Sequence, residues 1–549
     1  MMPKSIYKKE YLIVLFSLII AFLCLWLRAA PPYYPGKYFL AEDGFVFTQQ
    51  AWTAGISSLW LPYASYLHLY IRLVALFCHF FELNLIETSY VFLFGWLIAF
   101  SSMIVIIVVR AHSFKLPSLY IYWLVVLITL QPQPEFGEVF FRLTNSQWPL
   151  GAGLGIYLLT RNKNKPSILE LCFIIVLSLS GPFSLFVAPL FFLKEWIEKN
   201  LKNTYPLLIT LFLCAIVQGI LIAFNVRGGP LKSHHDIPTA IILIGNTLFF
   251  NVWGLFGVKR ILFMIATAFF FWISVLISFK TVFLSKNTLR SKISPALLFF
   301  FAFICLLSAI FDGFSSPKAL SERYLFIPYT VFFFSAAILP FDSKKSFFYI
   351  FLSMSCICLI NFNKIMLGKA FAPNPQFKSY SHFAEYDRIL VPIAPQSYDF
   401  NCTFSFGKAA LPGSLSKFSP LQTPNLYSFS GNEIKTNISN QMIIAKIKNN
   451  TSTLVFSEPL YCSKGSDIGV EIALHRNKKG FLTLWWSDNK DFTNRQSISY
   501  IGKKGNIKVN FAFPNTKKEI YLAFSPNDRI DTVEIKSLNV YCLPEGKNI

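Results

Sequence analysis

Residues 11–27 read YLIVLFSLIIAFLCLWL and carry no charged side chain. A helix of about 20 apolar residues crosses the hydrocarbon core of a bilayer, so this run predicts a transmembrane helix. Lys4, Lys8 and Lys9 precede the run, and cytoplasmic segments are rich in Lys and Arg, which puts the N-terminus in the cytoplasm. The run is long for a signal peptide, and no convincing small-x-small cleavage site follows it. We therefore expect a retained first helix.

The composition extends this expectation to most of the chain. Of the 549 residues, 54% are hydrophobic and 17% aromatic, while only 14% are charged. That balance excludes a soluble globular protein and fits a polytopic α-helical membrane protein with some soluble mass attached. The net charge of +22 does not indicate nucleic acid binding, because most Lys and Arg residues separate the apolar runs, as cytoplasmic anchors do.

Six Lys/Arg clusters, near Lys4, Arg110, Arg161, Lys194, Lys280 and Lys344, set the expected sidedness. Placing all six in the cytoplasm gives about 11 transmembrane helices, with residues 29–88 as a large first external loop. Ser178-Leu179-Ser180-Gly181-Pro182 should divide one apolar run into two short spans, because Gly and Pro interrupt helices. The expected spans are 11–28, 89–110, 117–131, 143–160, two within 167–193, 205–224, 261–279, 294–312, 324–340 and 346–362, with 241–258 as an external or re-entrant helix.

The pattern changes near residue 363, where short alternating runs separated by turn residues begin. Such runs predict an antiparallel, jelly-roll-like β-sandwich over 395–549, joined by a connector at 363–394 and lying outside the cell membrane. The expected strands are 469–474, 481–486, 497–501, 507–513, 519–524 and 532–542, preceded by 403–406, 442–447 and 454–457.

Two side-chain sets in this sandwich invite interpretation. Cys402, Cys462 and Cys542 allow one disulfide in an oxidising compartment and leave the pairing open. Trp485 and Trp486 are neighbours on a strand, so they face opposite sides and one of them belongs to the core. An exposed aromatic ring could stack on a sugar; a spacer or a partner-docking domain is the alternative.

The first external loop carries two adjacent carboxylates, Glu42 and Asp43. Charge beside hydrocarbon is costly, so carboxylates kept there indicate a function. Residues 42–52 and 66–81 are amphipathic and rich in aromatic residues, which predicts two helices lying on the membrane surface. Since a carboxylate is stabilised at a helix N-terminus, a simple helix cap is the plainer interpretation of the pair.

Further polar residues fall at the external ends of the expected spans. Arg or Lys at that depth can hold the phosphate of a lipid-linked sugar and stabilise the charge that develops as it leaves. One carboxylate is then enough to take the proton from an incoming hydroxyl. The residues concerned are Glu138, Arg142, Asn145, Gln147 and Trp148; Arg227, Lys232, His234, His235 and Asp236; and Asp312, Lys318, Glu322, Arg323 and Tyr324.

Several of these residues have a plainer interpretation. Arg142 could snorkel to the interface, and Arg323 could form a structural ion pair with a neighbouring acid. His234 and His235 could bind a metal, but adjacent histidines rarely hold one ion, so we predict no metal site and leave a divalent ion open. Arg72, in the second surface helix, is expected to pack rather than to act.

In these features, residues 1–362 resemble the GT-C class of integral-membrane glycosyltransferases. More narrowly, they resemble the bacterial O-antigen glucosyltransferases of the serotype-converting type. The resemblance is carried by the acidic pair, the surface helices behind it, the Ser-Gly-Pro break and the Arg323-Tyr324 pair. It implies transfer of glucose from undecaprenyl phosphate to a hydroxyl of O-antigen or another surface glycan, on the periplasmic side of the inner membrane.

The resemblance also implies roles for particular residues. Asp43 or Glu42 would be the base, and Arg323 would contact the donor phosphate. By the reasoning above, Lys318 and Arg142 would share the phosphate. The expected substrate contacts are Glu138, Asn145, Trp148, His234, His235 and Tyr324.

The C-terminal sandwich departs from the short-tailed members of that class, which leaves the acceptor open. Two other functions compete with transfer. One is transport of a lipid-linked glycan, although charges gathered at one face without an internal repeat disfavour a transporter. The other is a non-enzymatic envelope protein whose sandwich binds glycans, although about 11 spans are excessive for an anchor.

Overall fold

The computed structural model describes residues 4–28, 42–131, 139–162, 164–224, 289–311 and 322–339 of the helical part. In the C-terminal part it describes 389–392, 401–404, 434–439, 442–447, 454–455, 459–462, 467–478, 480–487, 496–502, 504–513, 519–525 and 531–543. Outside these residues lie the predicted site residues Glu138, His234, His235 and Lys318, the expected spans 261–279 and 346–362, the segment 241–258, and nearly all of the connector 363–394.

The chain divides into two compact units. The first comprises residues 1–35, 57–74 and 91–370, and the second comprises 36–56, 75–90 and 371–549. The first unit is helical, and the second contains the β-strands together with part of the predicted first external loop.

Within the described residues, three helices are long and apolar enough to cross a bilayer, judged by length and composition. They are α1 (Lys4–Arg28), α4 (Leu85–Ser113) and α9 (Leu201–Phe224). The other helices of the first unit are α5 (Ser118–Thr129), α6 (Gln147–Leu159), α7 (Ile168–Ser178), α8 (Ser184–Ile197), α12 (Leu289–Phe311) and α13 (Phe326–Ala337). Helices therefore lie where the described apolar runs predicted them, but the structure does not show 11 spans.

The predicted break within 167–193 is confirmed. Helix α7 ends at Ser178 and α8 begins at Ser184, so Gly181 and Pro182 lie in the connection between them. Ser167 caps α7, since its hydroxyl accepts a hydrogen bond from the Glu170 amide at 3.2 Å.

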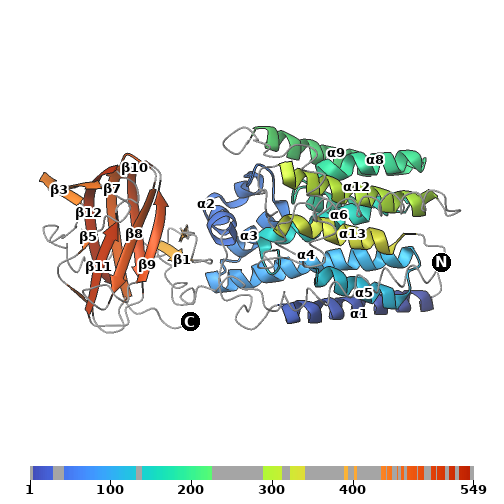
Figure 1. Cartoon of the computed structure of the whole chain (residues 1–549), viewed down its shortest axis with the longest axis horizontal. Helices are drawn as coiled ribbons and strands as arrows, with labels where there is room; N and C mark the ends of the chain where they lie inside the picture. Colours follow the sequence, from blue (N-terminus) through green and yellow to red (C-terminus); the bar gives the residue numbers. More distant parts are fainter. Residues whose placement is uncertain are drawn as a thin grey trace, which may run out of the picture. The chain divides into compact units, whose positions relative to one another are not determined.

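Helix α6 is the centre of the first unit and packs against α7, α8, α12 and α13 (Figure 1). Its glycines permit this close approach, because small residues let helices pack tightly where water supplies no driving force. A Cβ added at Gly151 would collide with the ring of Phe183, and one added at Gly155 would collide with the ring of Phe301.

Two of the cations that served to predict sidedness, Arg161 and Lys194, are buried near the C-terminal end of α6. Arg161 pairs with Glu170 through Nε and Oε1 at 2.6 Å and through Nη2 and Oε2 at 3.2 Å. Lys194 Nζ lies 2.7 Å from Glu195 Oε1 and 3.4 Å from Glu198 Oε2. Burying a charge is costly unless it is paired, so these contacts let the ends of α6, α7 and α8 pack around charged groups.

The described part of residues 29–88, which the sequence predicts to be the first external loop, is helical where the aromatic-rich segments predicted helices. A π-helical turn, η2 (Asp43–Thr48), continues into α2 (Gln49–Ala54), and a 3₁₀ turn, η3 (Gly55–Trp60), follows. Helix α3 (Leu69–Phe80) matches the second expected segment.

The described C-terminal strands form two sheets (Figure 1). One sheet has seven strands in the order β2-β1-β10-β7-β12-β4-β3. The other has five strands: four in the order β5-β11-β8-β9, and β6, which also pairs with β11. The strands of both sheets are β1 (Ile389–Pro392), β2 (Asn401–Phe404), β3 (Ile434–Ser439), β4 (Met442–Ile447), β5 (Leu454–Val455), β6 (Leu460–Tyr461), β7 (Asp467–Arg476), β8 (Gly480–Ser487), β9 (Gln496–Gly502), β10 (Gly505–Phe513), β11 (Glu519–Ser525) and β12 (Asp531–Leu543).

Each predicted strand overlaps an observed one, with ends that move by a few residues, although 405–406 and 456–457 lie outside the described residues. Strands β1, β3 and β6 were not predicted. Strand β1 falls in the expected connector and pairs with β10 in parallel, so the expectation of a wholly antiparallel sandwich is wrong at this pair.

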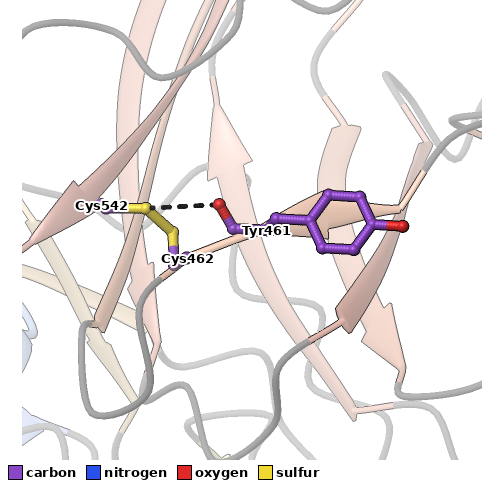
Figure 2. Close-up of a disulfide and its surroundings, with 3 residues drawn as sticks. All are labelled: Tyr461, Cys462 and Cys542. Carbon is purple, nitrogen blue, oxygen red and sulfur yellow. Dashed lines mark hydrogen bonds between the residues drawn. A yellow bond between two sulfur atoms is a disulfide. The ribbon is translucent and has the colours of Figure 1, made fainter.

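Side chains of the described strands connect the two sheets in two ways. Trp486 of β8 stacks on Phe513 of β10 at 4.3 Å between ring centroids. Cys462, next to β6, forms a disulfide with Cys542 of β12 (Figure 2). The pairing that the sequence left open is therefore Cys462 with Cys542, and it ties the edge of one sheet to a central strand of the other.

Candidate functional site

Two 3₁₀ turns in the first unit lead directly into apolar helices and bring predicted site residues together. Turn η4 (Leu143–Ser146) precedes α6, and η5 (Glu322–Leu325) precedes α13, which packs against α6. Trp148 and Tyr324 meet edge to face, with ring centroids 5.3 Å apart. Trp148 Nε1 donates a hydrogen bond to Asn145 Oδ1 at 3.3 Å.

A cation completes this arrangement. The Arg323 guanidinium carbon lies 5.5 Å from the centre of the Tyr324 ring, a cation–π distance. We call Asn145, Trp148, Arg323 and Tyr324 the Trp148 cluster. All four were predicted as site residues, and the structure gathers them from two turns far apart in the sequence.

The Ser-Gly-Pro break lies against the same cluster. Trp148 packs on Phe183, with ring centroids 5.5 Å apart. Gly181 is close enough to Phe183 that an added Cβ would come within 2.8 Å of its ring. The starts of α6, α8 and α13 therefore lie at one end of the unit, and their helix dipoles place partial positive charge there. An end of this kind favours an anion when a cationic side chain is also present.

A segment of the first loop docks on this end through an amide that the sequence analysis overlooked. Gln218 of α9 is 0% exposed. Its Oε1 accepts from the Leu67 amide at 2.9 Å, and its Nε2 donates to the carbonyls of Leu67 at 3.3 Å and Gly181 at 3.0 Å. One side chain thus joins the loop to the break between α7 and α8. The signal for it was an amide inside an apolar run, where polar groups are costly.

Other loop contacts reinforce the docking. The Tyr70 amide donates to Ser180 Oγ at 2.9 Å, and the Tyr66 hydroxyl donates to Gln147 Oε1 at 3.1 Å. The buried His68 ring lies 4.6 Å from the Tyr66 ring, with its Nε2 3.2 Å from the Tyr63 carbonyl oxygen. These tyrosines and His68 were also missed, because their positions depend on partners more than 70 residues away or on loop geometry.

Two arginines of the first unit stand in contrasting surroundings. Arg142 is half-buried at the start of η4, and its carbonyl accepts a hydrogen bond from the Asn145 amide at 3.1 Å. Arg72 of α3 is only 1% exposed, and burial lowers the pKa of its guanidinium to about 10. It therefore stays charged at neutral pH. The prediction that Arg72 packs inside the fold agrees with this burial.

Glu42 and Asp43 belong to the second unit. Asp43 opens η2 and is 6% exposed, and its carbonyl accepts from Thr48 Oγ1 at 2.7 Å. Glu42 occupies the N-cap position, yet its side chain makes no capping hydrogen bond. Within the second unit, η2 lies beside strand β2. The plainer interpretation of Glu42 as a helix cap is therefore not what the structure shows.

Among the described residues, no group of three or more His, Cys, Asp and Glu side chains is placed to hold a metal ion. The two histidines considered as ligands, His234 and His235, lie outside those residues.

No family model and no curated protein matches the chain. Among solved structures, one described as "BiXyn10A CBM1 APO" is 14% identical and covers 21% of this chain and 89% of its own, with a TM-score of 0.18. A carbohydrate binding module of family 29 is 13% identical and covers 24% and 89%, with a TM-score of 0.17. The enzymatically active domain of bacteriophage CBA120 tailspike protein 4 is 11% identical and covers 22% and 20%, with a TM-score of 0.18. Likeness at this level carries no inference about function.

Proposed function

We propose that this chain is a membrane-embedded glycosyltransferase. It moves a sugar from a polyprenyl-phosphate carrier to a hydroxyl of a surface glycan on the periplasmic side of the bacterial inner membrane. The observation that supports this most is the Trp148 cluster. A guanidinium suits a phosphate, while aromatic rings and a side-chain amide suit a sugar. The cluster places both kinds of group at one end of a helical unit.

In the proposed reaction, the bond between the anomeric carbon and the phosphate oxygen breaks, and its electron pair stays on the phosphate. Arg323, aided by the starts of α6, α8 and α13, stabilises that negative charge. The acceptor oxygen forms the new bond to the anomeric carbon. A base takes its proton. The resemblance to the serotype-converting enzymes assigns that role to Asp43, with Glu42 as the alternative. A phosphate leaves without a proton donor, so a second acid is not required.

Two further observations support the assignment to a membrane and to its outer side. Within the described part of the chain, three helices have the length and composition of spans. The Cys462–Cys542 disulfide is of a kind that persists in oxidising compartments, as expected for a periplasmic β region. Glucose, undecaprenyl phosphate and an O-antigen acceptor are the specific substrates that the resemblance to serotype-converting enzymes favours.

The test is transfer by the purified full chain in lipid nanodiscs, which enclose no compartment. Radiolabelled sugar on a polyprenyl phosphate would be supplied with a polysaccharide acceptor, and label should appear in the polysaccharide. Absence of transfer from every lipid-linked sugar, with movement of the labelled lipid across sealed vesicles, would overturn the proposal in favour of transport.

A further inference from the structure

The two outward faces of the β-sheets differ in chemistry. On the seven-stranded sheet, Lys508 Nζ pairs with Glu471 Oε2 at 2.8 Å. On the same sheet, Lys536 Nζ donates to Asn506 Oδ1 at 2.9 Å. Cross-strand polar pairs of this kind stabilise a sheet; here the two lysines are exposed, whereas Glu471 is buried. The outward face of the five-stranded sheet instead carries aromatic residues and hydroxyl residues.

The direction of Trp485 follows from its neighbour. Trp486 is 5% exposed and stacks on Phe513 of the opposite sheet, so it points between the sheets. Leu482 and Leu484, at even-numbered positions like Trp486, are buried as well. Because successive strand residues point to opposite faces, Trp485 points outward, and it is half-buried there.

Small residues flank Trp485 in the register. Its Cα partner on β11 is Ala523, which is 2% exposed, and its Cα partner on β9 is Ser497. The next outward residue of β8 is Thr483, a half-buried hydroxyl residue whose Cα partner on β11 is the buried Ser525. Hydroxyl groups both donate and accept hydrogen bonds, as sugar hydroxyls do.

Two tyrosines continue the aromatic row on the same face. On β11, Tyr521 lies two residues before Ala523, and Glu519 lies two residues before Tyr521. The register partner of Glu519 on β6 is Tyr461. Alternate strand residues are separated by roughly 7 Å, so Trp485, Tyr521 and Tyr461 form a stepped line of rings. Glu519 is the one charged residue among the outward positions of the described strands of this sheet.

The disulfide anchors the outer end of this line. Tyr461 belongs to a strand of two residues, and the following Cys462 is bonded to Cys542. Figure 2 shows the Tyr461 ring directed away from the disulfide, while its carbonyl oxygen lies 3.9 Å from Cys542 Sγ. The side chain of Tyr461 is 52% exposed. An exposed ring on a covalently anchored strand loses little conformational entropy when it binds a ligand.

We propose that Trp485, Tyr521 and Tyr461, which we call the aromatic row, bind a neutral glycan chain by stacking on successive sugar rings. The Thr483 hydroxyl, half-buried on the same face, hydrogen bonds to a sugar hydroxyl. The outward positions of the described strands of this sheet carry no Lys or Arg, which does not suit nucleic acid, an anionic lipid or an acidic polysaccharide. We identify the bound glycan with the acceptor of sugar transfer. That identification rests on the proposed function.

The test measures binding without any donor. The purified full chain in nanodiscs is titrated calorimetrically with maltohexaose, laminarihexaose and mannohexaose, which are neutral. We expect one or more of these to bind. Trp485→Ala should weaken that binding at least tenfold, Tyr521→Ala and Tyr461→Ala should weaken it severalfold, and Trp485→Phe should keep most of it.

Trp196→Ala is the matched control, because it removes an exposed indole of α8, in the helical unit and not in the β region. It should leave the affinity unchanged. Thermal unfolding of each variant shows whether the fold survives, and the conservative Trp485→Phe variant keeps the comparison informative if the alanine variant unfolds.

Three results would overturn the proposal: no neutral hexasaccharide binds the wild-type chain, affinity is unchanged in folded Trp485→Ala and Tyr461→Ala, or the face binds anionic vesicles instead. Transfer to a short acceptor does not require the aromatic row. Loss of transfer with intact glycan binding would therefore count against the proposed function alone, and loss of binding with intact transfer against the aromatic row alone.

Discussion

Trp148 and Tyr324 meet at 80° between ring planes, one from the first turn of α6 and the other from the turn before α13. The contact fixes where two helix starts lie relative to each other. It also places Arg323, the neighbour of Tyr324, at the same end as the amide of Asn145. Groups suited to a phosphate and to a sugar are thus held together by one aromatic pair.

Arg323 should be required for efficient transfer. Arg323→Gln removes the charge that stabilises the departing phosphate, and we expect a loss of kcat/KM of about 10²-fold or more. Arg323→Lys keeps the positive charge but lacks the planar guanidinium, so its kcat/KM should lie between those of the wild type and Arg323→Gln. Steady-state transfer kinetics measure both. Lys202→Gln, an exposed cation at the start of α9, is the control and should behave as wild type.

Gln218 should hold the loop in place. Gln218→Leu keeps the bulk of the side chain but leaves the Leu67 amide and the Gly181 carbonyl without this partner. Each buried polar group left without its hydrogen bond costs about 1–3 kcal/mol. The thermal unfolding midpoint in detergent should fall clearly. Thr210→Val is the control, because it removes one local hydrogen bond of α9, from Oγ1 to the Pro206 carbonyl. It should change the unfolding midpoint little. An equal fall in both variants would contradict the role of Gln218.

Gly151 should tolerate no side chain. Gly151→Ala pushes a methyl group into the Phe183 ring, which itself supports Trp148. Overpacking of this kind costs about 1–3 kcal/mol, and we expect both stability and transfer to fall. Gly219→Ala is the matched control, because the nearest atom to its added Cβ, in Leu185, is 3.4 Å away. If the two variants behave alike, the close packing of α6 on the break is not limiting.

The β region should lose stability at high pH partly through Tyr541. Burial, aided by the Glu471 carboxylate, raises the pKa of Tyr541 above its ordinary value near 10. Its contribution to stability is present below that ordinary pKa and is lost as pH rises through the higher folded-state pKa, because the unfolded chain ionises first. Tyr541→Phe should flatten the alkaline fall in the free energy of unfolding. Parallel curves for both proteins would contradict this.

The sequence predicted element type better than element length. The apolar runs located the described helices, and Gly181 and Pro182 correctly marked the break, because these residues interrupt helices for local steric reasons. The short length of α13 was not foreseen, since the 3₁₀ turn η5 takes residues that hydropathy assigns to the helix. Among the described residues, three helices rather than all of the expected ones are long enough to cross a bilayer.

The site was predictable in part for a similar reason. Arg323, Tyr324, Asn145 and Trp148 were found because they lie at the ends of apolar runs, and sidedness alone places such ends together. Gln218 was missed because its role depends on carbonyls and an amide contributed by distant segments. Tertiary hydrogen bonds of this kind leave no periodic signal in a sequence.

The central claim is that a carboxylate in the first external loop takes the proton of the acceptor hydroxyl. The most direct test compares transfer from a labelled polyprenyl-phosphate sugar by Asp43→Asn, Glu42→Gln and the wild-type chain in nanodiscs. Glu82→Gln, an exposed carboxylate of the same loop, is the control. Loss of a general base costs about 10²–10⁴-fold, which we predict for Asp43→Asn in a protein that still folds. Full transfer activity in both Asp43→Asn and Glu42→Gln would contradict the account.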